Sequence, residues 1–413
     1  RDRSPSRGLG DVYKRQKLSI VKTKEGVSYL YPFILVTSLF FLWGFAHSIL
    51  DVLNKHFQEV LVISKTKSAL IQAVVYGGYF LMALPAGMFI KRYGYRAGII
   101  LGLLLYGLGA FLFIPGSFLM SFYFFLFSLF IIGCGLTCLE TASNPYVTVL
   151  GEPESAASRL NLAQSFNGLG WIFGPLIGGL ILFSDDSQAS DIIYPYLIIG
   201  CSVIVIALCF IRIPLPEVKE ESFSAIIEKK LHRYPHFVWG VVVLFLYVAA
   251  QTGINSFFIN YVTETAPEIS NRTASLLLSF GGMGLFMAGR FAGSYLMRKV
   301  KATFLLGING IGAILMMLIV LTQLKWISIT ALFLCFLFES IMFPTIFALS
   351  LKGLGYHTKK ASSILIMSIV GGAIAPIMMG MLGEESMAIG FIIPLLCFIA
   401  IFIYAIRFSK LYR

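Results

Sequence analysis

One carboxylic acid stands in the middle of an apolar segment of this sequence. The stretch GCGLTCLETASNPY covers residues 133–146, and its Glu140 follows a long run of phenylalanine, leucine and isoleucine. A charged carboxylate inside a membrane costs about 3 kcal/mol or more, so this acid should be protonated, paired or solvated by a cavity. Such a group can take a proton from one side and release it when its surroundings change. Glu140 is therefore a candidate proton carrier, the alternative being a permanently neutral acid that bonds a neighbouring helix.

A second acid, Asp51 in SILDVLNK, lies near the end of the first apolar segment. It comes 19 residues after Pro32, about 28 Å along a straight helix, which is close to the outer boundary of a membrane. This spacing leaves two interpretations open, a functional acid and an ordinary interfacial one. His47, one turn earlier, could also titrate, although we expect a neutral, hydrogen-bonded helix residue there.

Amide side chains are the candidates for recognising a polar ligand. Gln164 and Asn167 in NLAQSFNG lie three residues apart and share one helix face. Amides both donate to and accept from hydroxyl groups, as a sugar requires. Gln251 and Asn255 in QTGINS are weaker candidates, and Trp43 could stack on a sugar ring. The alternatives are helix–helix hydrogen bonds for the amides and apolar packing for Trp43.

Spacings typical of enzymes do not occur in the sequence. We find no Ser/His/Asp, metal-ligand or phosphate-binding arrangement. All six cysteines lie in apolar segments, where thiols behave as small hydrophobic groups. The sequence therefore predicts a protein that is not an enzyme, needs no metal or cofactor beyond a coupling proton, and binds no nucleic acid.

Apolar helices must carry these polar residues. The chain has 413 residues, a mean hydropathy of +0.85 and only 13% charged residues. Apolar runs of about 20 residues recur along it, which is typical of a polytopic membrane protein. We predict an all-α membrane protein with twelve transmembrane helices. The expected spans are 30–54, 68–90, 97–114, 118–150, 159–183, 192–213, 236–262, 273–297, 303–322, 326–352, 360–382 and 387–408.

The basic residues are distributed unevenly between the two predicted membrane faces. The face that carries the amino terminus has 26 lysines and arginines, and the opposite face has five. Residues 1–16 are Arg-rich, have no apolar run and lack an initiator Met, so we expect a non-native, adapter-like leader. Without its five basic residues the ratio is still 21 to five. This bias predicts that both termini are cytoplasmic.

The longest polar segment, residues 214–235, divides the predicted spans into six and six. We expect it to be a cytoplasmic linker between an amino-terminal half, 17–213, and a carboxyl-terminal half, 236–413. Three features recur in the two halves at offsets of 206, 199 and 201 residues. They are Gly87 and Arg92 with Gly293 and Arg298, Glu140 and Pro145 with Glu339 and Pro344, and Pro175 with Pro376. The chain is therefore predicted to be a duplicated, pseudo-symmetric six-helix unit, with its substrate site between the halves.

Several longer strings resemble the fucose/glucose/galactose permease family of the major facilitator superfamily. They are FFLWGFAHSILDVLNKHF, YGGYFLMALPAG, KRYGYRAGI, LETASNPYVTVLG, RLNLAQSFNGLG and FPTIFALSLKGLG. The similarity runs from about residue 32 to 408, and it is greatest to L-fucose:proton symporters. It implies the major facilitator fold and a monomeric, proton-coupled monosaccharide importer in the lipid bilayer of a bacterial inner membrane.

The resemblance also implies roles for individual residues. Asp51 and Glu140 match proton-coupling acids of the family. Glu140, Gln164 and Asn167 match its sugar contacts. Ser48, beside His47, stands where better-known fucose permeases have paired asparagines, so we add Ser48 to the sugar-binding candidates.

The basic loop after the second span departs from the wider superfamily. Lys91 replaces the usual acidic residue, whereas the spacing from Gly87 to Arg92 is kept. Lys91, Arg92 and Arg96 are predicted to hold the cytoplasmic helix ends together in one state of a gate. The alternative is a purely topological role for these positive charges.

Two other functions remain open at this point. A passive or sodium-coupled carrier of glucose, galactose or a related hexose would use the same fold. A transporter-like sugar sensor would bind without transport, and it is the more remote alternative because the chain has no long signalling domain.

Overall fold

The computed structural model describes residues 28–151, 156–183, 193–212, 231–297, 300–354 and 358–412. The expected leader, 1–16, and most of the expected linker lie outside these ranges. Within them, eleven apolar segments are long enough to cross a membrane. One of these, Lys65–Leu119, has 55 residues and contains two predicted spans. The eleven segments therefore correspond to the twelve predicted crossings.

The amino-terminal half consists of long helices joined by short connections. Gly94 has a φ of +85°, and this left-handed conformation turns the chain between the second and third crossings. The helices are α1 (Leu30–Val60), α2 (Lys65–Ser68), α3 (Leu70–Phe111), α4 (Phe113–Leu119), α5 (Phe122–Val149), α6 (Ala156–Leu182) and α7 (Ile193–Arg212).

The carboxyl-terminal half has the same plan with more interruptions. Its α-helices are α8 (Pro235–Thr265), α9 (Asn271–Leu276), α10 (Gly284–Leu296), α11 (Ala302–Leu321), α12 (Lys325–Glu339), α13 (Met342–Leu351), α14 (Thr358–Met367), α15 (Gly371–Leu382), α16 (Met387–Gly390) and α17 (Ile392–Leu411). A π-helix, Leu277–Met283, joins α9 to α10, and 3-10 turns lie at Leu231–Arg233 and Ser368–Val370.

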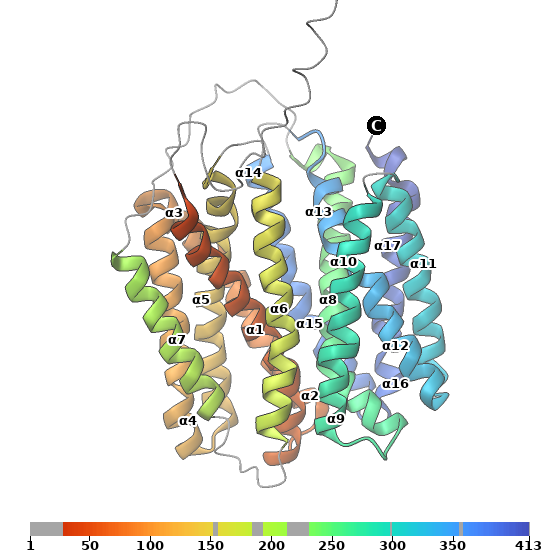
Figure 1. Ribbon diagram of the computed structural model, residues 1–413. Coiled ribbons are helices and arrows are strands. Elements are labelled where there is room, and N and C mark those ends of the chain that lie inside the picture. Colours follow the sequence, from red (N-terminus) through yellow and green to blue (C-terminus); the bar gives the residue numbers. More distant parts are fainter. Residues whose placement is uncertain are drawn as a thin grey trace, which may run out of the picture.

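The two halves stand side by side (Figure 1). The beginning of α1 and the end of α17 lie at one end of the bundle, as an even number of crossings requires (Figure 1). Helices α2, α9 and α16 lie at the opposite end (Figure 1), which is the predicted external end. Contacts between the halves are made by α8 against α1, α15 against α2 and α3, and α6 against α9.

Small residues allow the helices inside a half to approach closely. A Cβ atom added to Gly78 of α3 would lie 3.0 Å from the Phe130 carbonyl oxygen of α5, and one added to Gly102 would lie 2.8 Å from the Gly135 oxygen. Helices in lipid associate through such packing because lipid provides no hydrophobic drive between them. This close crossing fixes α5, and hence Glu140, against α3.

The repeated Glu and Pro pair has different surroundings in the two halves. Helix α5 runs unbroken through Glu140, whereas the matching tenth span breaks at Ser340 and Ile341, between α12 and α13. Pro344 cannot donate to the carbonyl four residues earlier, which belongs to Ser340. That oxygen instead accepts a bond from Arg290 Nε at 3.3 Å. A single long helix was expected over 326–352, and the structure shows instead two helices separated by this break.

The orientation in the membrane is testable with reporter fusions. A reporter after Arg413 should give a cytoplasmic signal, and one inserted in SDDSQASD, residues 184–191, should give an external signal, because the basic residues gather on the first side. Alkaline phosphatase and green fluorescent protein fusions at both positions measure this. A cytoplasmic signal from 184–191 would contradict the proposed topology.

Candidate functional site

A chain of hydrogen bonds links three helices of the amino-terminal half. His47 Nε2 of α1 lies 3.0 Å from the Tyr79 hydroxyl of α3. The same hydroxyl donates to Glu140 Oε1 of α5 at 2.7 Å. His47 and Tyr79 are buried, whereas Glu140 is only half-buried. The predicted proton carrier is thus the more accessible end of a polar chain that leads inward.

Asp51 is buried at the contact between the two halves. It is 1% exposed, and its Oδ1 accepts a bond from Gln72 Nε2 of α3 at 3.0 Å. Ser256 of α8, in the other half, places its hydroxyl 3.5 Å from the same oxygen. The interfacial interpretation of Asp51, which the helix length left open, therefore does not describe this structure. The acid contacts both halves, as a group that senses their relative motion should.

Several predicted sugar ligands belong to the packing of α1 against α6. Asn167 Nδ2 donates to the Phe40 carbonyl oxygen at 3.1 Å. The buried Ser48 hydroxyl lies 3.1 Å from the Gly170 oxygen. The Trp43 ring is also buried and lies 4.1 Å from the ring of Phe40. Asn167 and Ser48 thus hold the two helices together in this conformation, and a sugar would compete for their polar atoms.

The remaining amides lie on two helices from different halves. Gln164 of α6 and Gln251 of α8 are both half-buried, so each has surface available to a ligand. Asn255, one turn after Gln251, is 1% exposed, and its Oδ1 has no hydrogen-bond partner in the described part of the chain. The amide pair on α6 and the pair on α8 thus remain predicted sugar contacts.

An aromatic contact joins the halves beside His47. The Tyr76 ring centre lies 5.5 Å from that of His47, and the Tyr76 hydroxyl accepts a bond from Thr252 Oγ1 of α8 at 3.2 Å. Gly372 of α15 also packs against the Tyr76 ring, so closely that no side chain would fit there. The histidine therefore lies directly behind a contact between the two halves.

Glu339, the counterpart of Glu140, is fully buried near the helix break. Neither of its carboxyl oxygens has a hydrogen-bond partner among the described residues. Its backbone carbonyl oxygen accepts a bond from the Tyr247 hydroxyl at 3.2 Å. Arg290 of α10 packs its guanidinium 4.6 Å from the centre of the Phe286 ring.

The predicted gating residues lie at the turn of α3 on the predicted cytoplasmic side. Arg96 donates from Nε to the Phe210 carbonyl oxygen at 3.0 Å and from Nη2 to the Ile211 oxygen. Both oxygens are at the carboxyl end of α7, where helices favour cations. Lys91 and Arg92 are exposed. In this conformation Arg96 ties two helices of one half together, and a gate across the halves remains a prediction.

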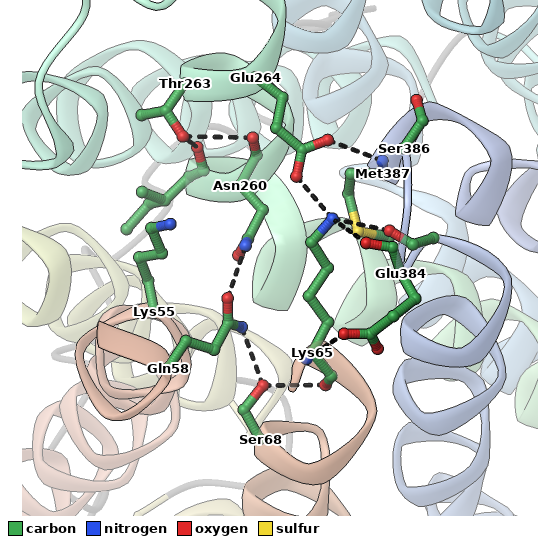
Figure 2. A network of polar contacts seen from close by, with 12 residues as sticks. Lys55, Gln58, Lys65, Ser68, Asn260, Thr263, Glu264, Glu384, Ser386 and Met387 are labelled. Carbon is green, nitrogen blue, oxygen red and sulfur yellow. Dashed lines mark hydrogen bonds and ion pairs between the residues drawn. The ribbon is translucent and has the colours of Figure 1, made fainter. Parts of the chain in front are cut away.

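A polar network closes the opposite end of the bundle (Figure 2). Lys65 Nζ of α2 lies 2.7 Å from Glu264 Oε1 of α8 and donates to the Gly383 carbonyl oxygen at 2.7 Å. Glu384, after α15, accepts bonds from the backbone N–H and the hydroxyl of Thr66.

A second set of bonds continues this closure toward Asp51. Asn260 Nδ2 donates to Gln58 Oε1 at 2.7 Å (Figure 2). One turn deeper, Asn54 Nδ2 donates to the Ser256 carbonyl oxygen at 2.6 Å. Each bond joins α1 to α8, so the halves are in contact from the predicted external surface down to the buried acid. This network could not be predicted from the sequence, because its charged residues resemble ordinary loop residues.

Metal binding receives no support from the described residues. They contain no group of three or more His, Cys, Asp or Glu side chains that could hold an ion. The cysteines in these ranges are all free.

Comparison with known proteins identifies the family that has this architecture. The model of the Major Facilitator Superfamily matches residues 33–376. The chain belongs to the major facilitator superfamily. The two-half architecture, with polar residues at the contact between the halves, is thus that of a transporter family.

Two relatives within the superfamily are similar along nearly their whole length. An L-fucose-proton symporter of Escherichia coli (strain K12) is 39% identical over 409 residues, which cover 92% of this chain and 93% of that protein. A glucose/galactose transporter of Brucella abortus (strain 2308) is 36% identical over 400 residues, covering 94% and 97%. The resemblance to the fucose/glucose/galactose permeases is therefore confirmed.

Solved structures agree with this assignment. The major facilitator transporter FucP in the outward conformation matches with a TM-score of 0.71 at 37% identity, covering 92% of this chain and 99% of that one. A D-xylose-proton symporter matches with a TM-score of 0.73 at 14% identity, which shows the shared fold alone. The predicted major facilitator fold is confirmed.

Proposed function

We propose that this protein is a proton-coupled monosaccharide importer of a bacterial inner membrane, with L-fucose as the first candidate sugar. The observation that carries the proposal is Asp51, a carboxyl buried between the two halves of a chain whose relatives include a sugar–proton symporter. A buried acid in a membrane is expensive and is usually functional. Glu140 provides a second, more exposed carboxyl in the same half.

The geometry supports alternating access around these acids. Protonation neutralises the carboxyls, the sugar binds between the amides of α6 and α8, and the halves rock around it. Asp51 touches Gln72 of one half and Ser256 of the other, so its surroundings change whenever the halves separate. Lys91, Arg92 and Arg96 are proposed to act at the cytoplasmic gate, with both termini on that side and the protein working as a monomer.

Glucose or galactose is the second candidate substrate. The glucose/galactose transporter of Brucella abortus is nearly as similar to this chain as the fucose symporter is. His47 and Ser48 stand in the α1 segment where the resemblance to fucose permeases departs, and Ser48 bonds the backbone of α6. A passive or sodium-coupled hexose carrier would use the same amides without needing to titrate Asp51.

Uptake into proteoliposomes tests the proposal. Radiolabelled L-fucose, D-galactose, D-glucose and N-acetylglucosamine are supplied with an imposed proton gradient, an imposed sodium gradient or neither. Accumulation above equilibrium with the proton gradient alone supports symport. Equilibration without accumulation indicates a passive carrier, and binding without any uptake indicates a sensor. Either result would overturn the proposal.

Sugar recognition by the α6 amides can be tested by truncation. Gln164→Ala or Asn167→Ala should weaken sugar binding about tenfold or more, since a sugar hydroxyl loses its partner in a dry site. Isothermal calorimetry with the transported sugar measures this. Asn309→Ala is the matched control, because Asn309 bonds the Leu305 oxygen within its own helix. If both α6 variants bind like the parent protein, the amides are not sugar ligands.

A further inference from the structure

The direction of the hydrogen bonds around Tyr79 assigns the state of His47. A phenol has one proton, and the Tyr79 hydroxyl donates it to Glu140 Oε1 at 2.7 Å. While Glu140 is ionised, the Tyr79 oxygen can only accept from His47, so the imidazole then carries its proton on Nε2. This assignment follows from the network. The neutral ring is left with a free lone pair on Nδ1.

Two buried polar atoms one turn apart on α1 have no hydrogen-bond partner among the described residues. His47 Nδ1 and Asp51 Oδ2 both lack a hydrogen-bond partner in the part of the chain that the structure describes. Buried polar atoms are almost always bonded, and exceptions call for an explanation. Residues four apart on a helix share a face, with their Cβ atoms about 6 Å apart. A side-chain rotation or one bridging water joins groups at that separation.

We propose that His47 and Tyr79 form a proton relay between Asp51 and Glu140. The proposal rests on the proton-coupled function stated above. Asp51 gives a proton from Oδ2 to His47 Nδ1, His47 gives its Nε2 proton to the Tyr79 oxygen, and Tyr79 gives its proton to Glu140 Oε1. One proton leaves Asp51 and one arrives at Glu140, while the histidine changes tautomer and stays neutral. Rotation of the ring and the hydroxyl resets the chain.

The surroundings explain why Asp51 needs such a route. The acid is 1% exposed, and the path toward the α2 end is closed by the Asn54–Ser256 and Gln58–Asn260 bonds. Glu140 at the other end of the relay is only half-buried. A proton held by Asp51 therefore reaches the more accessible acid most directly through His47.

The groups packed around His47 suit proton transfer without charge separation. Tyr76 and Tyr79 of α3 contact the ring, and Trp171 of α6 stacks on it at 6.1 Å between ring centres. Asp51 is the acid on its own helix, and Glu140 is reached through Tyr79. Aromatic walls hold the ring without supplying a competing proton acceptor as strong as a carboxylate.

Tyr79→Phe tests the relay because it removes one oxygen atom and keeps the ring. Proton-driven accumulation should slow at least about tenfold, since a positioned proton-transfer group contributes a factor of this size or more. Sugar counterflow between equal pools should stay near the parent value. His47→Gln is the second variant, because its amide can still donate to Tyr79 but cannot pass a proton on by changing tautomer. Tyr106→Phe is the matched control, an equally buried hydroxyl that lies 3.5 Å from the Leu42 oxygen.

The outcomes separate the relay from the transport function itself. If parent protein and Tyr106→Phe accumulate sugar while Tyr79→Phe and His47→Gln only exchange it, the relay is supported. Accumulation at the parent rate by Tyr79→Phe would overturn it, and so would an equal loss of counterflow, which would place Tyr79 among the sugar ligands. A parent protein that never accumulates sugar would instead contradict the proposed function. Thermal melting of each purified variant establishes that it is folded.

Discussion

Asp51→Asn should abolish proton-driven sugar accumulation while sugar exchange continues. An amide mimics the neutral acid, so it can keep the bonds to Gln72 and Ser256, but it has no proton to release. The uptake level under a proton gradient should therefore fall to that of vesicles without a gradient. Gradient-driven uptake and counterflow, measured on the same proteoliposomes, separate coupling from binding. Glu140→Gln should lower both signals, because the family pattern places Glu140 at the sugar.

Glu268→Gln is the control for this experiment. Glu268 lies in a connection of the carboxyl-terminal half, its side chain is 48% exposed and pairs with Lys325 at 2.8 Å, and such surface pairs contribute little. We expect parent-like accumulation from it. Full proton-driven accumulation by Asp51→Asn would remove Asp51 from the coupling mechanism and favour Glu140 or His47 as the titrating group.

Gly380→Leu should slow turnover strongly by holding the α2 end of the bundle open. A Cβ at Gly380 of α15 would lie 2.9 Å from Thr66 Cα and 3.0 Å from the Lys65 backbone carbonyl. Backbone atoms cannot rotate away, so α2 must undock. Overpacking costs about 1–3 kcal/mol or more, which is roughly a 5- to 150-fold shift in an equilibrium. Uptake rates should fall by at least that factor, while sugar binding persists.

Accessibility labelling gives a direct measure of the open end. In a chain without its native cysteines, Asn54→Cys should react faster with an impermeant maleimide when Gly380→Leu is also present, because Asn54 is buried within the closed end of the bundle. Gly284→Leu is the matched control, since a Cβ there meets nothing within 4 Å. Parent-like uptake by Gly380→Leu would mean that closure of α2 against α15 is not part of the cycle.

Much of the fold could be predicted because lipid imposes a simple rule. Backbone groups must be hydrogen-bonded within each apolar segment, so long runs of leucine and phenylalanine form helices. The residues at which the helices end were harder to predict. Helix α1 continues to Val60, past the predicted residue 54, because Asp51 and Asn54 face the other half and do not end the helix in water. The break after Glu339 depended on a tertiary partner, Arg290, for the freed oxygen.

The site was only partly visible in the sequence. The acids stood out because a carboxyl among leucines is costly, whereas Tyr79 did not, since tyrosine is common at membrane interfaces. The spacing YGGY, with Tyr76 and Tyr79 on one face and glycines between them, was the available signal. Thr66, Glu264 and Glu384 lie far apart in the sequence, and a network that assembles from two halves has no local pattern.

The network at the α2 end affects the free energy that is needed to separate the two halves. Its contacts are ion pairs and hydrogen bonds, such as those of Lys65 and Thr66 with Glu384 and Glu264. When the halves part, these groups exchange protein partners for water, so each bond contributes only about 0.5–1.5 kcal/mol net. An apolar plug of similar area would gain more from burial and would resist rehydration. A polar seal fixes the register of closure yet reopens at small cost, which suits a surface that must part and rejoin in every cycle.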